Sequence, residues 1–147
     1  MPSDGPYILA VDPGRDKIGL AILDLSGNEV EKRVIPAGEF DEVLDELENR
    51  FDLSMLAVGD GTESDEVLGK ASARNFPRII SVPEKGTTLE ARELAWKEHP
   101  PGGLWRILPR LFWPTPRDLD AWAAVVIGRR ALEKSSPQST GLSSNPS

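Results

Sequence analysis

The pattern of apolar and polar positions in the first part of the chain predicts three consecutive strands. Residues 7–12 (YILAVD) are a short apolar run typical of a buried strand, and residues 17–24 (KIGLAILD) are a second. Residues 25–28 (LSGN) suit the hairpin turn that follows, because glycine and asparagine tolerate a positive φ angle. Residues 29–35 (EVEKRVI) predict a third strand with one solvent-facing side, which Pro36 ends.

Helical and strand-like patterns alternate along the rest of the chain. Apolar residues at helical spacing predict amphipathic helices, and short apolar runs between them predict two more strands. The expected helices cover residues 39–51, 63–74, 89–98 and 118 onward, and the expected strands cover residues 55–59 and 78–82. Thr62 is the expected N-cap of the second helix, and Thr87 or Thr88 that of the third. The last helix shows one apolar stripe, formed by Leu119, Trp122, Ala123, Val126 and Ile127.

A three-strand meander followed by alternating helices and strands predicts an α/β fold, with a mixed five-stranded sheet flanked by helices. A length of 147 residues suits one domain, which we expect over residues 1–134, and the Ser- and Pro-rich residues 135–147 predict a disordered tail. The absence of cysteine excludes a disulfide scaffold and fits a reducing compartment. Without a signal-peptide pattern or an apolar run of ~20 residues, a cytoplasmic protein is expected.

The charge is distributed unevenly along the chain. The net charge is −7, but residues 1–70 carry 17 acidic and 6 basic side chains, whereas residues 71–147 carry 7 acidic and 11 basic ones. A basic second half is compatible with a polyanionic partner on one face. Charge alone does not separate this interpretation from an ordinary solvated acidic surface.

Acidic residues at the ends of predicted elements are the first candidates for chemistry. Asp12 ends the first strand, Glu84 follows the fifth, and Asp120 lies in the first turn of the last helix. A carboxylate at the end of a buried strand is well placed for Mg²⁺, which prefers carboxylate oxygens. Taken singly, each also has a structural explanation as a turn residue, a solvated loop residue or a partner of the helix dipole. Asp118 is the better N-cap of the last helix, and Asp60 suits a turn.

Four segments together resemble the motifs of the YqgF/RuvX family, the Holliday-junction-resolvase-like and pre-16S rRNA-processing nucleases related to RuvC. The segments are VDPGRDKIGLAILD, VGDGT, PEKGTTLEAR and DAWAAVVIGRRAL, and their order and spacing agree over residues 7–132. The resemblance implies a ribonuclease-H-like fold in which Asp12, Glu84 and Asp120 are catalytic residues and ligands of Mg²⁺ or Mn²⁺. Such carboxylates could hold two metal ions that clamp the attacking and leaving oxygens of a phosphodiester. Structured RNA or branched DNA is the implied substrate.

The chain also departs from the family pattern around Glu84. Pro83 stands where an aspartate is usual, Gly86 where a bulkier residue is common, and Lys85 replaces an arginine with its bidentate phosphate geometry. Asp60 replaces a leucine and is a candidate accessory residue, as are Asp118 and Lys85. A catalytically weak or inactive relative that binds nucleic acid or protein is therefore the alternative. One half of a nucleotide-binding ATPase is a third interpretation, based only on the turn after Asp12.

A basic and aromatic segment, residues 104–113 (LWRILPRLFW), precedes the last helix. In a nucleic-acid interface, Arg106, Arg110 and Arg117 would contact phosphates, and Trp105 or Trp113 would stack on an unpaired base. The alternatives are a loop pinned to the core by its aromatic side chains and a partner surface, including that of a homodimer.

The remaining candidates favour structural roles. Arg129 and Arg130 near the end of the last helix are interpreted as complementing its dipole. His99 is the single histidine, and without a second histidine or any cysteine a zinc site has little support.

Overall fold

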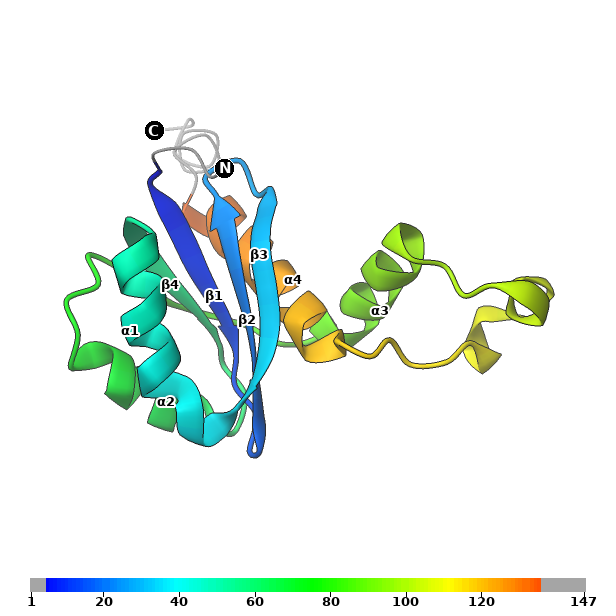
Figure 1. Ribbon diagram of the computed structural model, residues 1–147, viewed down its shortest axis with the longest axis horizontal. Coiled ribbons are helices and arrows are strands. Elements are labelled where there is room, and N and C mark those ends of the chain that lie inside the picture. Colours follow the sequence, from blue (N-terminus) through cyan, green and yellow to red (C-terminus); the bar gives the residue numbers. More distant parts are fainter. Residues whose placement is uncertain (1–4, 136–147) are drawn as a thin grey trace, which may run out of the picture.

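The chain folds into one mixed five-stranded sheet with helices on both faces (Figure 1). The computed structural model describes residues 5–135, so the predicted tail lies outside the described residues except for Ser135, which ends the last helix. The strands are β1 (Tyr7–Asp12), β2 (Lys17–Asp24), β3 (Glu29–Pro36), β4 (Leu53–Gly59) and β5 (Ile79–Val82). Their order across the sheet is β3-β2-β1-β4-β5. The first three strands are antiparallel, and β4 and β5 run parallel to β1, which confirms the predicted mixed sheet.

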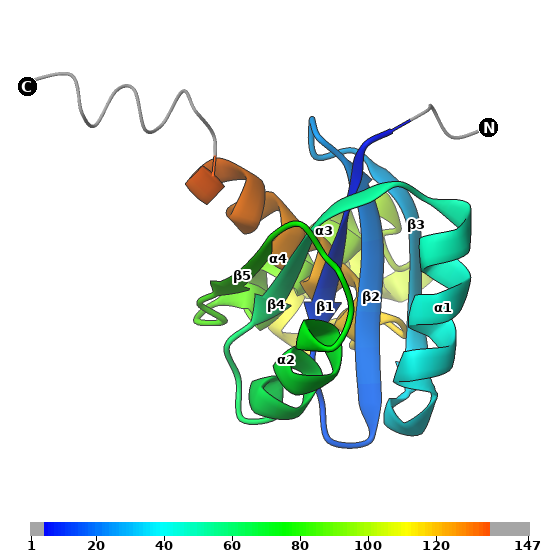
Figure 2. The ribbon, with the colours of Figure 1, turned by 90° about the vertical axis from the view of Figure 1, so that its left-hand side faces the viewer.

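Two pairs of helices cover the sheet. On one face lie α1 (Phe40–Arg50) and α2 (Ser64–Ser72), which stand in front of the strands in Figure 2. On the other face α4 (Leu119–Ser135) lies directly on the sheet, and α3 (Thr87–Glu98) packs on α4. Three short 3₁₀ helices complete the chain: η1 (Ala37–Glu39), η2 (Gly103–Ile107) and η3 (Arg110–Phe112). None of the described helices has the length and apolar character needed to cross a membrane.

The central strand β1 is apolar on both sides because each side meets a separate core. Tyr7, Leu9 and Val11 pack into the core under α1 and α2. Ile8 and Ala10 pack into the core under α4. Successive side chains of a strand alternate between faces, so the next position of the second set, Asp12, belongs to the α4 side.

The residues of the predicted apolar stripe are buried apart from the half-buried Leu119, but α4 is buried nearly all round, so the stripe covers only part of its buried surface. Every residue from Ala121 to Gly128 is buried, because the helix lies between the sheet and α3. Two glycines allow this close approach. A Cβ added at Gly128 would lie 2.6 Å from Cδ1 of Leu23, and one added at Gly19 would overlap the backbone carbonyl oxygen of Asp120. The contact between α4 and the sheet therefore requires glycine at both positions.

The other predicted elements are present, with boundaries that shift by one or two residues, but two predicted N-caps were wrong. The helix α2 follows Glu63, without a side-chain cap. The helix α3 begins at Thr87, preceded by Gly86 with φ 79°. This left-handed conformation, which glycine adopts readily, turns the chain into the helix. The Thr87 hydroxyl donates a hydrogen bond to the carbonyl oxygen of Glu84 at 2.8 Å and so stabilises the preceding loop instead.

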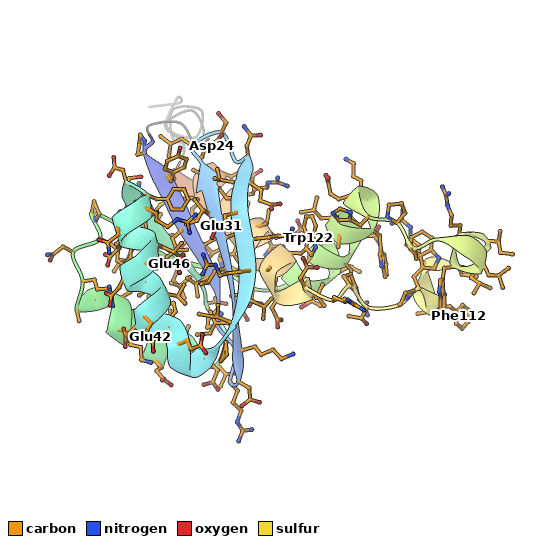
Figure 3. All side chains as sticks on the ribbon, viewed as in Figure 1. Asp24, Glu31, Glu42, Glu46, Phe112 and Trp122 are labelled. Carbon is orange, nitrogen blue, oxygen red and sulfur yellow. The ribbon has the colours of Figure 1, made fainter. Side chains whose placement is uncertain are left out.

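Residues 99–117, which we call the arm, project from the body between the end of α3 and the start of α4 (Figure 1). The arm contains η2 and η3 and no longer element. Figure 3 shows Phe112 far out on this projection, with Trp122 at its base. The arm thus carries Phe112 well away from the sheet.

We predict that Gly19→Ala destabilises the protein by about 1–3 kcal/mol, because the added Cβ meets backbone atoms that no rotamer change can move. Urea unfolding measures the change. The control is Gly69→Ala in α2, where nothing lies within 4 Å of the added Cβ. Since alanine favours a helix interior, this control should gain about 0.5–1 kcal/mol. Equal stability of the two variants would contradict the packing constraint at Gly19.

Candidate metal centre

The carboxyl ends of the parallel strands β1, β4 and β5 share one edge of the sheet (Figure 2). Asp12 ends β1, Asp60 directly follows β4, and Glu84 lies two residues beyond β5. The carboxyl edge of parallel strands is where α/β proteins usually bind ligands. The edge therefore gathers acidic side chains from three segments of the chain.

The third predicted acid, Asp120, reaches this place through the packing of α4. In the β1–β2 pairing, Asp12 lies opposite Gly19. The backbone carbonyl of Asp120 lies against Gly19, in the space that a side chain there would fill. The first turn of α4 is thereby held beside the end of β1, and Asp120 is close enough for its charge to act on Asp12.

Two glycines after β4 provide the space for the Glu84 carboxylate. A Cβ added at Gly59 would lie 2.6 Å from Oε1 of Glu84, and one added at Gly61 would overlap Oε2. Both oxygens of this side chain therefore point at the β4 end of the sheet. Any larger residue at either glycine would displace the carboxylate.

Asp12 and Glu84 form a carboxyl pair that needs a proton or a cation between its members. Burial, then the negative charges of Glu84 and Asp120, and then a hydrogen bond with Glu84 raise the pKa of Asp12 from 3.8 to about 8. The buried Oε1 atom of Glu84 accepts no hydrogen bond from a backbone N–H or from a basic or hydroxyl side chain of the described residues. The proton on Asp12 thus compensates a site where two carboxylates would otherwise repel each other.

The side chains as they stand do not form the predicted set of three ligands. Within residues 5–135, no three acidic or histidine side chains are grouped closely enough to hold a metal ion. The residues nevertheless fit a hard divalent cation, because Glu84 offers a buried carboxylate oxygen without a donor and Asp12 offers a second carboxylate beside it. Mg²⁺ retains several waters and needs only one or two protein carboxylates. Asp120 stands near as a further carboxylate.

The loop that carries Glu84 is fixed from two sides. The backbone N–H of Glu84 donates to Oδ1 of Asp60 at 3.0 Å, and the N–H of Asp60 donates to the carbonyl of Val82 at 2.9 Å. From α4, Nη1 of Arg130 donates to the carbonyls of Pro83 and Lys85, both at 2.9 Å. Asp60 therefore orients the loop, and so does Arg130, which also pairs with Glu90 on α3.

Sequence reasoning missed the contribution of Arg130, which it assigned to the helix dipole. Pro83 lies 47 residues earlier in the chain, so no local pattern links the two. Its neighbour Arg129 likewise donates a hydrogen bond to the carbonyl of Gly27, in the turn between β2 and β3. Both arginines connect α4 to loops that sequence spacing could not relate to it.

The two other candidate accessory residues are placed differently. Asp118 accepts a hydrogen bond from Nε1 of Trp122 at 3.0 Å and forms an ion pair with Lys32 at 3.7 Å. In the first turn of α4, the backbone carbonyl of Asp118, and not its side chain, accepts hydrogen bonds from the N–H groups of Ala121 and Trp122. Lys85 is exposed on the loop next to Glu84. Asp118 therefore has a structural role at the base of the arm.

The predicted nucleic-acid residues of the arm divide into two groups. Trp113 donates from Nε1 to the carbonyl of Leu108 at 2.9 Å and packs edge-on against Trp96. Arg110 lies over the Trp113 ring and pairs with Glu93 of α3. Both residues thus hold the arm together. Trp105, Arg106 and Arg117 are exposed.

A mixed α/β domain with a half-buried carboxyl pair at its sheet edge is the class that fold and site define. No family model and no curated protein matches the chain. The ethanolamine utilization protein EutJ from Carboxydothermus hydrogenoformans is similar in structure, with 17% identity and a TM-score of 0.45 over 62% of this chain and 42% of its own. A ROK-family transcriptional regulator, a homologue of the E. coli MLC protein, has 11% identity and a TM-score of 0.41 over 60% of this chain and 30% of its own. The chain spans less than half of either protein, and such distant likenesses decide neither fold nor function.

We predict that the carboxyl pair makes the stability of the protein fall as the pH rises through the neutral range. The folded state binds the Asp12 proton up to about pH 8, whereas the unfolded state releases it near 3.8, so deprotonation favours unfolding between these values. The slope should approach, at most, about 1.4 kcal/mol per pH unit. Asp12→Asn should remove it, as urea unfolding at a series of pH values measures.

The control for this experiment is Asp24→Asn. Asp24 accepts hydrogen bonds from Asn28 that lower its pKa, so its contribution to stability is lost only in acid, below its ordinary value of 3.8. This variant should keep the wild-type loss of stability between neutral and mildly alkaline pH. If Asp12→Asn kept the same slope as well, the shared proton would be refuted.

Proposed function

We propose that the chain is a divalent-metal-dependent nuclease with a ribonuclease-H-like fold, which hydrolyses phosphodiester bonds in structured RNA or branched DNA. The observation that carries the proposal is the Asp12–Glu84 carboxyl pair, with its unpartnered buried oxygen and with Asp120 beside it. These are the three acidic positions that match the YqgF/RuvX motifs. A protein gains nothing in stability from such a pair, so a cation or proton function explains it better.

The topology supports the same proposal. A three-strand antiparallel meander followed by parallel strands β4 and β5, in the order β3-β2-β1-β4-β5, is compatible with the mixed ribonuclease-H-like sheet that the resemblance implies. The acids lie at the end of the central strand, after β5 and at the start of α4. Segments that resemble the family motifs thus converge on one edge of the sheet.

The chemistry assigns separate tasks to the residues at this edge. Asp12 and Glu84 would hold Mg²⁺ or Mn²⁺, with Asp120 as the third carboxylate. When bound, the metal lowers the pKa of the attacking water and neutralises charge on the leaving oxygen. Asp12 must first release its proton, so metal affinity should rise with pH up to about 8. Asp60 and Arg130 keep Glu84 in position through its loop.

A non-catalytic nucleic-acid- or protein-binding relative is the second candidate. The absence of a preformed three-ligand group among residues 5–135 favours it, as does Pro83 in place of the usual aspartate. Such a relative would keep the fold and use the arm for binding. The two candidates differ in whether metal binding leads to cleavage.

We predict that Mn²⁺ or Mg²⁺ raises the melting temperature of the wild-type chain, and that Asp12→Asn abolishes the rise, because binding to the folded state stabilises it. Thermal unfolding with and without the metal measures this. The control Asp65→Asn changes an exposed acid on α2 and should keep the full metal effect. An equal rise in melting temperature for the wild type and Asp12→Asn would contradict a metal site at Asp12.

We predict Mn²⁺-dependent cleavage of a branched DNA or a folded precursor RNA, reduced at least about 100-fold by Glu84→Gln, because the amide offers no anionic ligand. A gel assay with labelled substrates measures the rate. Metal binding by the wild type without cleavage of either substrate would overturn the nuclease proposal and favour the binding module.

We predict that Asp60→Ala weakens Mn²⁺ binding about 10-fold or more, whereas Asp60→Asn has a small effect. The asparagine keeps an oxygen that accepts the Glu84 N–H, but alanine releases the loop. Calorimetric titration of both variants distinguishes the two roles of Asp60. A similar loss in both variants would make its charge important, and Asp60 would then be a ligand.

A further inference from the structure

The arm concentrates exposed apolar surface at one place on the molecule. Nine large apolar side chains are exposed among residues 5–135, and six of them belong to the arm: Leu104, Trp105, Ile107, Leu108, Leu111 and Phe112. Their exposed fractions range from 41% to 87%. Contiguous apolar surface of this kind marks an interaction site in a water-exposed domain.

The arm is held in a defined shape despite this exposure. Trp113 donates to the Leu108 carbonyl at 2.9 Å and packs on Trp96, whose own Nε1 donates to the Pro114 carbonyl at 3.1 Å. The Arg110–Glu93 ion pair connects the arm to α3. A surface that is already ordered loses less conformational entropy when a partner binds. The exposed side chains are thus presented for contact.

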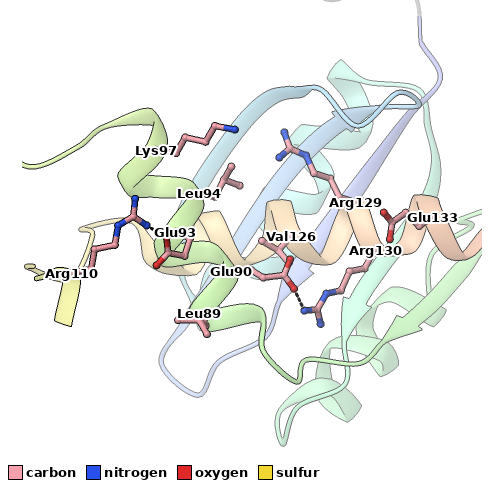
Figure 4. Close-up of a pocket in the computed structure, with 10 residues that line it drawn as sticks. All are labelled: Leu89, Glu90, Glu93, Leu94, Lys97, Arg110, Val126, Arg129, Arg130 and Glu133. Carbon is pink, nitrogen blue, oxygen red and sulfur yellow. Dashed lines mark hydrogen bonds and ion pairs between the residues drawn. The ribbon is translucent and has the colours of Figure 1, made fainter.

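A groove of complementary character runs between α3 and α4 on the same chain (Figure 4). Its volume is about 690 Å³, and Leu89, Leu94 and Val126 contribute its apolar lining. Leu89 is 61% exposed. Arg110 is the one arm residue that lines the groove, so the apolar side chains of the chain's own arm leave it open.

The arm and the rest of the chain carry opposite net charges. Residues 99–117 contain Arg106, Arg110 and Arg117 and no acidic residue. Since the whole chain carries −7, the residues outside the arm together carry −10. The groove itself is close to neutral, because Glu90, Glu93 and Glu133 line it together with Lys97, Arg129 and Arg130, so charge contributes to the contact only through single arginine–glutamate pairs.

We propose that two copies of the chain form a homodimer in which the arm of each inserts into the α3–α4 groove of the other. The arm adjoins the groove at Arg110, and a two-fold axis would form the same arm-to-groove contact twice and close the assembly. A stable dimer buries roughly 1,200–2,000 Å² in total, and two arms with six exposed large apolar side chains each supply much of it.

The side chains favour this occupant over nucleic acid. Four of the six exposed apolar residues are the aliphatic Leu104, Ile107, Leu108 and Leu111, whereas single-stranded nucleic acid is bound mainly by aromatic stacking and basic groups. Of the three arginines, Arg110 is already paired with Glu93. The dimer is independent of the nuclease proposal, because it uses none of the acidic residues at the sheet edge.

Sedimentation of the full chain over a range of concentrations tests the dimer. Leu111→Asp in the arm and Leu89→Asp in the groove should each raise the dimer dissociation constant at least about tenfold, by placing a charge in an apolar contact. The control Leu25→Asp alters a residue that is 53% exposed in the β2–β3 turn and should leave the dimer unchanged. A chain that stays monomeric, or a dimer insensitive to both variants, overturns the proposal.

Cross-linking distinguishes arm-to-groove contact from arm-to-arm contact. The chain has no cysteine, so Leu89→Cys chains mixed with Leu111→Cys chains should give a disulfide-linked dimer only when both are present. Cross-linking of Leu111→Cys chains alone would indicate arm-to-arm contact and would contradict the insertion of each arm into the groove of the other copy. So would a monomer whose Leu111→Asp variant loses binding to a labelled RNA, which would assign the arm to nucleic acid. Asp12→Asn should remain dimeric whether or not the chain is a nuclease.

Discussion

The close approach of α4 to the first two strands is the constraint on which the rest of the structure depends. Gly19 and Gly128 leave no side chain between the helix and the sheet, so the helix backbone rests on β2 and on Ala10 of β1. This position fixes Asp120 beside Asp12 and directs Arg130 to the loop of Glu84.

The candidate site lowers the free energy of unfolding, and this loss of stability indicates a role other than a structural one. Burial and two neighbouring negative charges keep Asp12 protonated up to about pH 8, so the protein forgoes the stability that an ordinary solvated carboxylate would retain. Structural needs at a strand end would be met by a neutral residue. Gly61 points the same way, because every close contact of a Cβ added there would be with the Glu84 carboxylate, and glycine lowers stability wherever its freedom is unused.

The sheet edge and the arm are joined by a short connection. Asp118, at the base of the arm, binds Trp122 and Lys32, and two residues later Asp120 enters the acidic edge. A partner bound to the arm would therefore lie close to the first turn of α4. Dimerisation and the chemistry proposed for the acids are separate properties, but the residues for both lie next to the start of α4.

The amino-acid pattern alone determined the strands and the helices to within two residues, because hydrophobic periodicity is a local property of the sequence, whereas the three acids were singled out by the resemblance to known motifs. It could not determine that α4 is covered on both sides, that Arg130 and Asp60 orient the Glu84 loop, or that Trp113 and Arg110 are used within the arm. Apart from the Trp113–Leu108 hydrogen bond, these facts depend on contacts between segments far apart in the chain. The packing of α4 against the sheet and α3 decides the burial of this helix and the position of Arg130, since sequence spacing carries no record of which surfaces meet.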